Sequence, residues 1–135
     1  MLEQQDIFLA GESDTDTFRI PSLLIAADGD VLAFCEARRQ SQSDTGQIDI
    51  VMRRSGDGGQ TWGNIETVVS VPDMTCGNNC PVLEKSSGRI LLTFCQNRID
   101  GPEPAIKRGE APRTVWCMAS DDHGATWSDP VTLFE

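Results

Sequence analysis

Ser55-Gly56-Asp57-Gly58-Gly59-Gln60-Thr61-Trp62 is the first of two copies of an eight-residue pattern, S-x-D-x-G-x-T-W, in this chain. The second copy runs from Ser120 to Trp127, and the aspartates Asp57 and Asp122 lie 65 residues apart (122 − 57). A pattern of this length rarely recurs by chance, so the chain consists of repeated units.

The sequence around the two copies repeats as well. Ile20-Pro21-Ser22-Leu23 is echoed by Cys80-Pro81-Val82-Leu83, and Leu32-Ala33-Phe34-Cys35 by Leu92-Thr93-Phe94-Cys95, each 60 residues later (80 − 20 and 95 − 35). The change from 60 to 65 implies five extra residues in the second unit. We place them between Ile99 and Pro112, where three prolines and two glycines occur.

Short apolar runs bounded by turn residues predict four strands in each unit. They span 21–26, 31–36, 48–53 and 66–71 in the first unit, and 81–84, 90–95, 114–119 and 131–134 in the second. Asp28-Gly29-Asp30 and Ser86-Ser87-Gly88 are predicted hairpin turns, because glycine tolerates the positive φ of tight turns. The repeat predicts an all-β fold of two four-stranded antiparallel propeller blades, at about 18–71 and about 80–135.

The eight-residue pattern itself has a mechanical interpretation. Its fixed positions are Ser55, Asp57, Gly59, Thr61 and Trp62 in the first copy, and Ser120, Asp122, Gly124, Thr126 and Trp127 in the second. Each aspartate can accept hydrogen bonds from N–H groups of its own turn, each glycine permits a tight backbone, and each tryptophan can pack on a neighbouring sheet. We therefore interpret both copies as structural rather than catalytic.

Composition excludes several classes of partner. The 135 residues include 21 acidic and 11 basic side chains, a net charge of −10, which argues against binding to nucleic acid or to anionic membranes. No apolar run is long enough for membrane insertion. The segment from Met1 to Asp6 is acidic and lacks the features of a signal peptide, which slightly favours an intracellular protein over a chain whose leader is missing.

The five cysteines are expected to be reduced and structural. Cys35, Cys95 and Cys117 fall in predicted strands, where cysteine behaves as a small hydrophobe. Cys76 and Cys80 flank a Gly-Asn-Asn segment and could close a small disulfide loop or contribute to a metal site. The single histidine, His123, is predicted on an exposed turn, so ligands for zinc are scarce, and we expect no metal and no cofactor.

Candidate functional residues concentrate in the first unit. Arg19 opens its first strand, Glu36 and Arg38 close its second, and Asp44 lies in the polar loop that follows. Arginines at strand ends on one rim could bind a carboxylate, whose shape matches the guanidinium fork, and Asp44 could exchange a proton with a leaving oxygen. The alternative is that the arginines are solvated strand ends and Asp44 is a turn residue.

These motifs together resemble the bacterial exo-α-sialidases. Phe18-Arg19-Ile20-Pro21 is similar to the FRIP motif of that family, and S-x-D-x-G-x-T-W is similar to its Asp box. Glu36-Ala37-Arg38-Arg39 and Asp44-Thr45-Gly46 follow in the family's order, and Cys76-Gly77-Asn78-Asn79-Cys80 resembles its second blade. The resemblance covers essentially the whole chain and implies part of a six-bladed propeller that acts on sialylated glycans.

The resemblance also implies roles for individual residues. Arg19 would hold the sialic-acid carboxylate, and Arg38 would contact that carboxylate or the sugar's 4-hydroxyl, with Glu36 close to this hydroxyl. Asp44 would be the general acid/base, and Asn78 matches a position near the N-acetyl pocket. Asn79 departs from the family pattern, which commonly has proline there and thereby leaves the shape of this loop open.

The chain contains no tyrosine, whereas the resemblance implies a tyrosine nucleophile. The other two carboxylate-binding arginines would belong to later blades. We therefore expect about two of six blades, inactive alone, whose open edges need the remaining blades or self-association. Two alternatives stay open: a sialic-acid-binding or assembly module formed by oligomerising two-bladed chains, and a structural remnant without ligand affinity.

Overall fold

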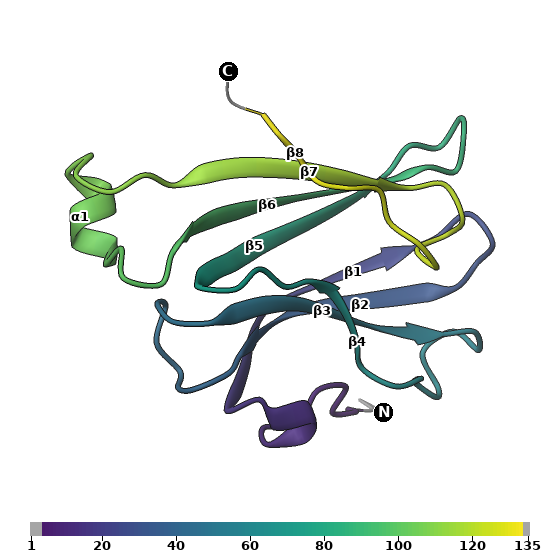
Figure 1. Ribbon diagram of the computed structural model, residues 1–135. Coiled ribbons are helices and arrows are strands. Elements are labelled where there is room, and N and C mark those ends of the chain that lie inside the picture. Colours follow the sequence, from purple (N-terminus) through teal and green to yellow (C-terminus); the bar gives the residue numbers. More distant parts are fainter. Residues whose placement is uncertain (1–3, 134–135) are drawn as a thin grey trace.

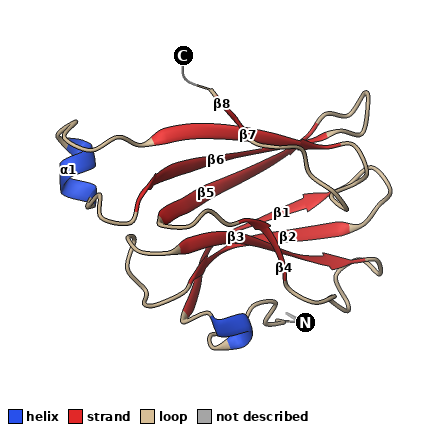
Figure 2. Ribbon diagram, in the orientation of Figure 1, coloured by secondary structure: helices blue, strands red, loops and turns tan. Residues whose placement is uncertain are grey.

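The computed structural model describes residues 4–133, which form two layers of β-strands (Figure 1 and Figure 2). The elements are η1 (Glu12–Asp14), β1 (Thr17–Ile25), β2 (Val31–Arg38), β3 (Ile48–Ser55), β4 (Glu66–Val69), β5 (Met74–Leu83), β6 (Ile90–Arg98), α1 (Glu103–Lys107), β7 (Thr114–Ser120) and β8 (Val131–Thr132). The all-β class is confirmed. The last predicted strand is shorter than expected, and its end at Phe134 lies outside the described residues.

Each layer is an antiparallel meander of four consecutive strands. In the first unit β1 pairs with β2, β2 with β3 and β3 with β4, and in the second unit β5 to β8 pair in the same way. A single parallel bridge, between Ile48 of β3 and Thr75 of β5, joins the two units. Four antiparallel strands per unit are the arrangement of propeller blades, as predicted.

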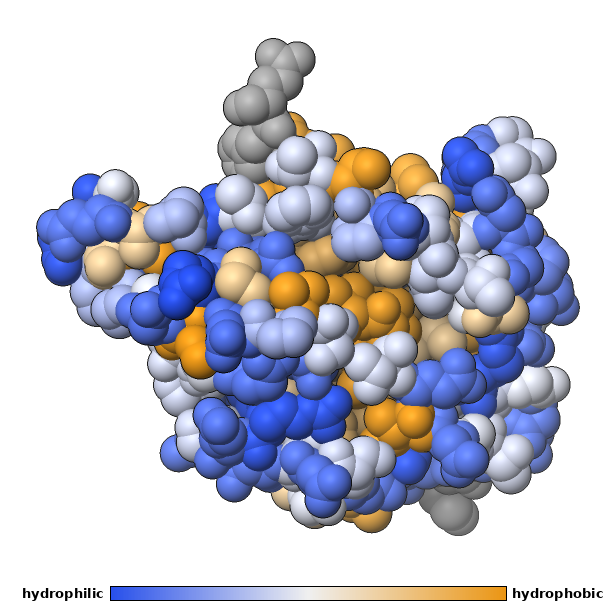
Figure 3. All heavy atoms as spheres, viewed as in Figure 1, coloured by the Kyte–Doolittle hydropathy of each residue, from blue (hydrophilic) through white to orange (hydrophobic). Residues whose placement is uncertain are grey.

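The core lies between the two layers. Phe34 and Met52 are fully buried on the first unit, and Ile90 and Leu92 face them from the second. Burial of each such side chain contributes roughly 1.5–3 kcal/mol to stability. Other apolar side chains stay exposed on β1, β5 and β8 or beside them: Leu23, Ile25, Val82, Val131 and Leu133. Figure 3 shows apolar atoms gathered in the middle of one face, with hydrophilic atoms around them.

The strand register corrects the predicted repeat of 60 residues. Val31 pairs with Ser55 and Ile90 pairs with Ser120, so the structural offset at these strands is 59 (90 − 31). Phe34 and Phe94 therefore lie on opposite faces of equivalent strands, because each must point toward the core that the two layers share. The insertion is six residues (65 − 59) rather than five. It contains α1 and falls in the predicted place.

Two β-bulges extend strands that were predicted too short. The register shifts between Arg19 and Ser22 in β1, and between Gly77 and Cys80 in β5. β1 consequently starts four residues before the predicted 21, and β5 starts seven residues before the predicted 81. A bulge absorbs an extra residue while pairing continues, so a segment such as Gly-Asn-Asn resembles a turn in sequence yet lies within a strand.

The mechanical interpretation of the Asp boxes agrees with the observed turns. Asp57 Oδ1 accepts hydrogen bonds from the N–H groups of Gln60 and Thr61 at 3.0 and 2.9 Å, and Asp122 Oδ1 accepts one from the N–H of Thr126 at 2.8 Å. Hydrogen bonds from the threonine hydroxyls come first among the causes that lower the pKa of both aspartates to about 2. Both carboxylates are thus occupied by their own turns.

The histidine and the cysteines differ in part from expectation. His123 is half-buried rather than exposed, and its Nδ1 is enclosed without a hydrogen-bond partner among the described residues. All five cysteines are unpaired thiols. Cys76 is buried whereas Cys80 is exposed, so the disulfide considered between them is not formed.

Candidate functional site

A cleft of about 300 Å³ lies at one end of the two layers, where β2, β5 and β6 meet the two long connections. Its lining comes from both units: Ile20, Glu36, Arg38, Asp44, Ile48, Thr75, Gly77, Asn78, Cys95, Asn97, Glu103, Lys107 and Arg113. In Figure 1 the β2–β3 connection and α1 lie at the same end of the molecule. The predicted candidates Glu36, Arg38, Asp44 and Asn78 are therefore brought together in one cleft.

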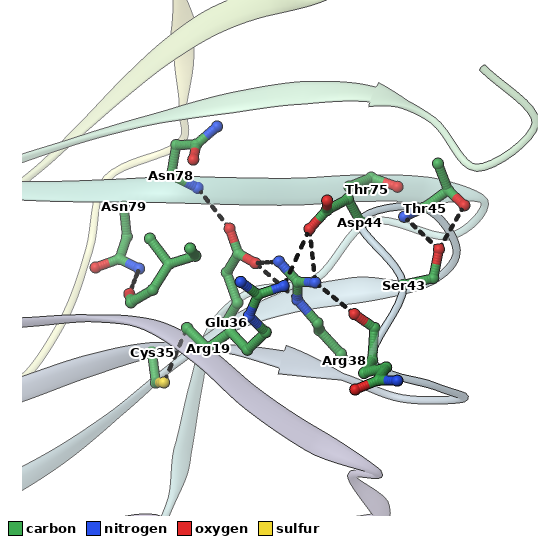
Figure 4. A network of polar contacts seen from close by, with 12 residues as sticks. Arg19, Cys35, Glu36, Arg38, Ser43, Asp44, Thr45, Thr75, Asn78 and Asn79 are labelled. Carbon is green, nitrogen blue, oxygen red and sulfur yellow. Dashed lines mark hydrogen bonds and ion pairs between the residues drawn. The ribbon is translucent and has the colours of Figure 1, made fainter. Parts of the chain in front are cut away.

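Glu36 and Arg38 form a buried ion pair at the end of β2. Their exposed fractions are only 4% and 3%, and both point into the cleft because residues two apart on a strand share a face. Arg38 donates from Nε at 3.1 Å and from Nη2 at 2.8 Å to Glu36 Oε2 (Figure 4). This two-point contact fixes the plane of the guanidinium and leaves Nη1 directed at the loop that carries Asp44.

Asp44 lies between two arginines at the open side of the cleft. Its Oδ1 is 2.7 Å from Arg38 Nη1 and 3.5 Å from Arg19 Nη1, while its side chain is 70% exposed (Figure 4). The hydrogen bond from Arg38 and the charge of Arg38 are the main causes that hold the pKa of Asp44 below its ordinary value. Arg19 is half-exposed, so two guanidinium groups converge on a position that solvent can reach.

The neighbour Arg39 points elsewhere. Its Nε donates to Asp49 Oδ2 at 2.7 Å and its Nη1 donates to the Thr15 hydroxyl at 2.8 Å. Arg39 thereby ties the strand end to the N-terminal segment. Of the two consecutive arginines, only Arg38 is available to the cleft.

The loop that carries Asp44 is anchored from both units. Arg38 Nη1 also donates to the Gln42 carbonyl at 2.8 Å, and the Thr75 hydroxyl of β5 donates to the Gly46 carbonyl at 2.7 Å. Between these anchors Asp44 makes ion pairs but no backbone contact to a strand. The base of the loop is therefore held while its tip stays exposed.

Asn78 and Asn79 occupy the β5 bulge. Asn78 lines the cleft, has a φ of 56°, and donates its N–H to Glu36 Oε1 at 2.8 Å. Asn79 is 6% exposed, donates its amide to the Ile20 carbonyl at 2.9 Å, and accepts a hydrogen bond from the Ser22 hydroxyl. The residue that departs from the family pattern thus links the bulges of β1 and β5, which answers the question about this loop.

The sequence reasoning missed the charged wall beside α1. Arg113 donates to Glu103 Oε2 at 2.6 Å and to Asn97 Oδ1 at 3.2 Å, and Lys107 lines the same cleft. With Arg19, the site gathers four basic and three acidic side chains, a local charge of +1 (4 − 3) in a chain of −10. The insertion between Ile99 and Pro112 was the signal that could have pointed to this wall.

The cleft has no evident metal ligands. Among residues 4–133, histidine, cysteine and carboxylate groups do not form any cluster of three that could hold a metal ion. Within the same range, no helix is both long enough and apolar enough to cross a membrane. The chemistry open to the cleft is therefore recognition of an anion by guanidinium groups and proton exchange by Asp44.

Comparisons with known proteins agree with this geometry. The model of the BNR repeat-like domain matches residues 29–135. An exo-alpha-sialidase of Aspergillus fumigatus is 31% identical over 87% of this chain and 33% of its own length. A sialidase of Micromonospora viridifaciens is 38% identical over 93% of this chain and 21% of its own length.

Solved structures show the same fold. The Hadza microbial sialidase Hz136 aligns with a TM-score of 0.82 and 26% identity, over 92% of this chain and 27% of its own. The chain thus spans about a third or less of the length of the relatives that it matches. With 107 of 135 residues matched (135 − 29 + 1), this chain belongs to the family of BNR repeat-like domains, and its relatives are sialidases of β-propeller fold.

Proposed function

We propose that the cleft binds the carboxylate of a terminal sialic acid, and that the chain serves the hydrolysis of α-linked sialic acids as part of a retaining exo-α-sialidase. The observation that carries this proposal is the convergence of Arg38 and Arg19 on a single carboxylate oxygen, that of Asp44. Two guanidinium groups that surround one carboxylate oxygen can surround another, and the exposed Asp44 can move aside.

In this proposal Asp44 is both the resting counter-ion and the acid/base. The hydrogen bond from Arg38 keeps the pKa of Asp44 low in the free site, so the carboxyl is ionised there. A ligand carboxylate that takes the guanidinium groups removes this hydrogen bond and adds a nearby negative charge. Both effects raise the pKa of Asp44, as an acid that protonates a glycosidic oxygen requires.

The other candidates receive supporting roles. The resemblance placed Glu36 near the sugar's 4-hydroxyl, but both Glu36 oxygens are engaged and the residue is 4% exposed, which favours a role through Arg38. Asn78 lines the cleft and would lie beside the N-acetyl group. Arg38 would contact the carboxylate or the 4-hydroxyl.

The chain alone would bind but not hydrolyse. It has no tyrosine to act as the nucleophile of this family, so that group would come from elsewhere. Exposed Leu23, Ile25 and Val82 on β1 and β5, with Val131 beyond them on β8, favour two blades, at about 18–71 and 80–135, that further blades or another copy of the chain cover. The sialic-acid-binding or assembly module stays the alternative function, and these same apolar faces favour it.

Titration with N-acetylneuraminic acid, followed by NMR, tests the binding. Arg38→Ala should weaken binding roughly 10- to 100-fold, because a hydrogen bond between charged groups is lost. Arg89→Ala is the matched control, since Arg89 is an exposed arginine paired with Asp121 at 2.7 Å and does not line the cleft. Equal affinity of the two variants would refute the proposed carboxylate site.

A fluorogenic sialoside tests the rest of the proposal. The 135-residue chain should show no turnover by itself. Turnover that Asp44→Ala removes would confirm the acid/base and overturn the claim that the chain is incomplete. Light scattering of the same sample separates the alternatives, because an assembly module predicts a trimer whereas a monomer excludes it.

A further inference from the structure

We infer that Gly77, on β5 of the second unit, is a positioning residue for Arg38 and acts through the carboxylate of Glu36. The inference concerns the geometry of the free site, and it rests on the proposed function only where ligand affinity is the readout. It assigns to the second blade a part in shaping the anion site that the first blade presents.

The space at Gly77 is the first observation. A Cβ built on this residue would overlap Glu36 Oε1 and would lie 3.1 Å from Glu36 Cδ. The φ of Gly77 lies outside the left-handed region, so an L side chain would fit the backbone here without strain. Glycine is thus required at this position by the neighbouring carboxylate and not by the conformation of the chain.

The second observation is that Glu36 has no freedom to retreat. Its Oε1 accepts the Asn78 N–H at 2.8 Å, and its Oε2 accepts both Nε and Nη2 of Arg38. The carboxylate is therefore held between the β5 backbone and the guanidinium. A methyl group at residue 77 would displace the carboxylate and, with it, the plane of Arg38 that aims Nη1 at the ligand position.

The register explains why the two units differ here. Arg19 pairs with Glu36 in the first unit, and Gly77 pairs with Cys95 in the second, so Arg19 and Gly77 occupy equivalent places next to their bulges. One copy of this place carries a ligand-binding arginine, while the other must stay empty because Glu36 fills it. The repeat has been used for opposite purposes in neighbouring blades.

The test is a double-mutant cycle. Gly77→Ala should shift the Arg38 Nε–H resonance and weaken binding of N-acetylneuraminic acid roughly 10- to 100-fold. In the Glu36→Asp background the carboxylate is withdrawn by one methylene, so the added methyl group should have little further effect on either readout. Gly63→Ala is the control, because its Cβ would meet only the Arg54 carbonyl, at an ordinary 3.5 Å.

The inference is overturned if Gly77→Ala behaves like Gly63→Ala, or if its effect is equally large in both backgrounds. Thermal unfolding covers the case in which Gly77→Ala destabilises the chain, since Glu36→Asp should then remove that loss too, and a loss that persists refutes the inference. The Arg38 Nε–H resonance is read without ligand. If the wild-type chain binds no sialic acid, the proposed function fails, while the resonance still decides the role of Gly77.

Discussion

The two Asp-box tryptophans hold the same place in the pattern but are packed differently, and this difference predicts unequal costs of removal. Trp127 packs on the inter-layer core, with its ring centroid 6.1 Å from that of Phe34 at an interplanar angle of 79°. Trp62 is half-buried and belongs to neither core cluster of the described residues; its Nε1 donates to Gln5 Oε1 at 3.4 Å. We expect Trp127→Ala to be much the more destabilising change.

The size of the difference follows from the contacts. Removal of a buried aromatic costs about 3–5 kcal/mol, and because Trp127 is only partly buried we take about 3 kcal/mol, its edge-to-face pair with Phe34 included. Trp62→Ala should cost about 1 kcal/mol, an average value for a substitution. With a urea m-value of about 1.5 kcal/mol/M, the 2 kcal/mol difference separates the two midpoints by about 1.3 M.

Urea unfolding of both variants, followed by far-UV circular dichroism, measures this separation. A cycle with Phe34→Leu adds a second check, because the ring pair should appear as a coupling of about 0.5–1.5 kcal/mol with Trp127→Ala and as none with Trp62→Ala. Coincident midpoints for the two tryptophan variants would refute the reasoning from packing.

Two further predictions concern titration and thiol chemistry. Asp122 has its pKa lowered from 3.8 to about 2 in the folded state, so its stabilising effect is full above about pH 4 and is lost as the pH falls through 2. The difference in urea midpoint between wild type and Asp122→Asn should therefore vanish toward pH 2, and a constant difference would contradict this. A thiol reagent should modify exposed Cys80 in the folded chain, whereas Cys35, whose pKa burial raises to about 12, should react only on unfolding; equal rates for the two would show the burial to be wrong.

The sequence by itself determined the local features of this protein. The repeat, the strands, the hairpin glycines and the Asp-box turns were all predicted, because each depends on groups within a few residues of one another. Asp57, for example, is satisfied by hydrogen bonds from Gln60 and Thr61 within its own turn. The family resemblance gathered Arg19, Arg38 and Asp44 at one rim, and in the structure their charged groups meet there.

Only the tertiary structure decided which faces meet. The offset of 59 rather than 60, the unequal packing of Trp62 and Trp127, and the empty place at Gly77 follow from the way in which one layer lies on the other. The basic wall beside α1 likewise reaches the cleft only through folding of the inserted segment. A local pattern specifies how a strand pairs and turns, but the neighbour that fills the space above it comes from a distant part of the chain, and the requirement at Gly77 comes from the carboxylate of Glu36, 41 residues away (77 − 36).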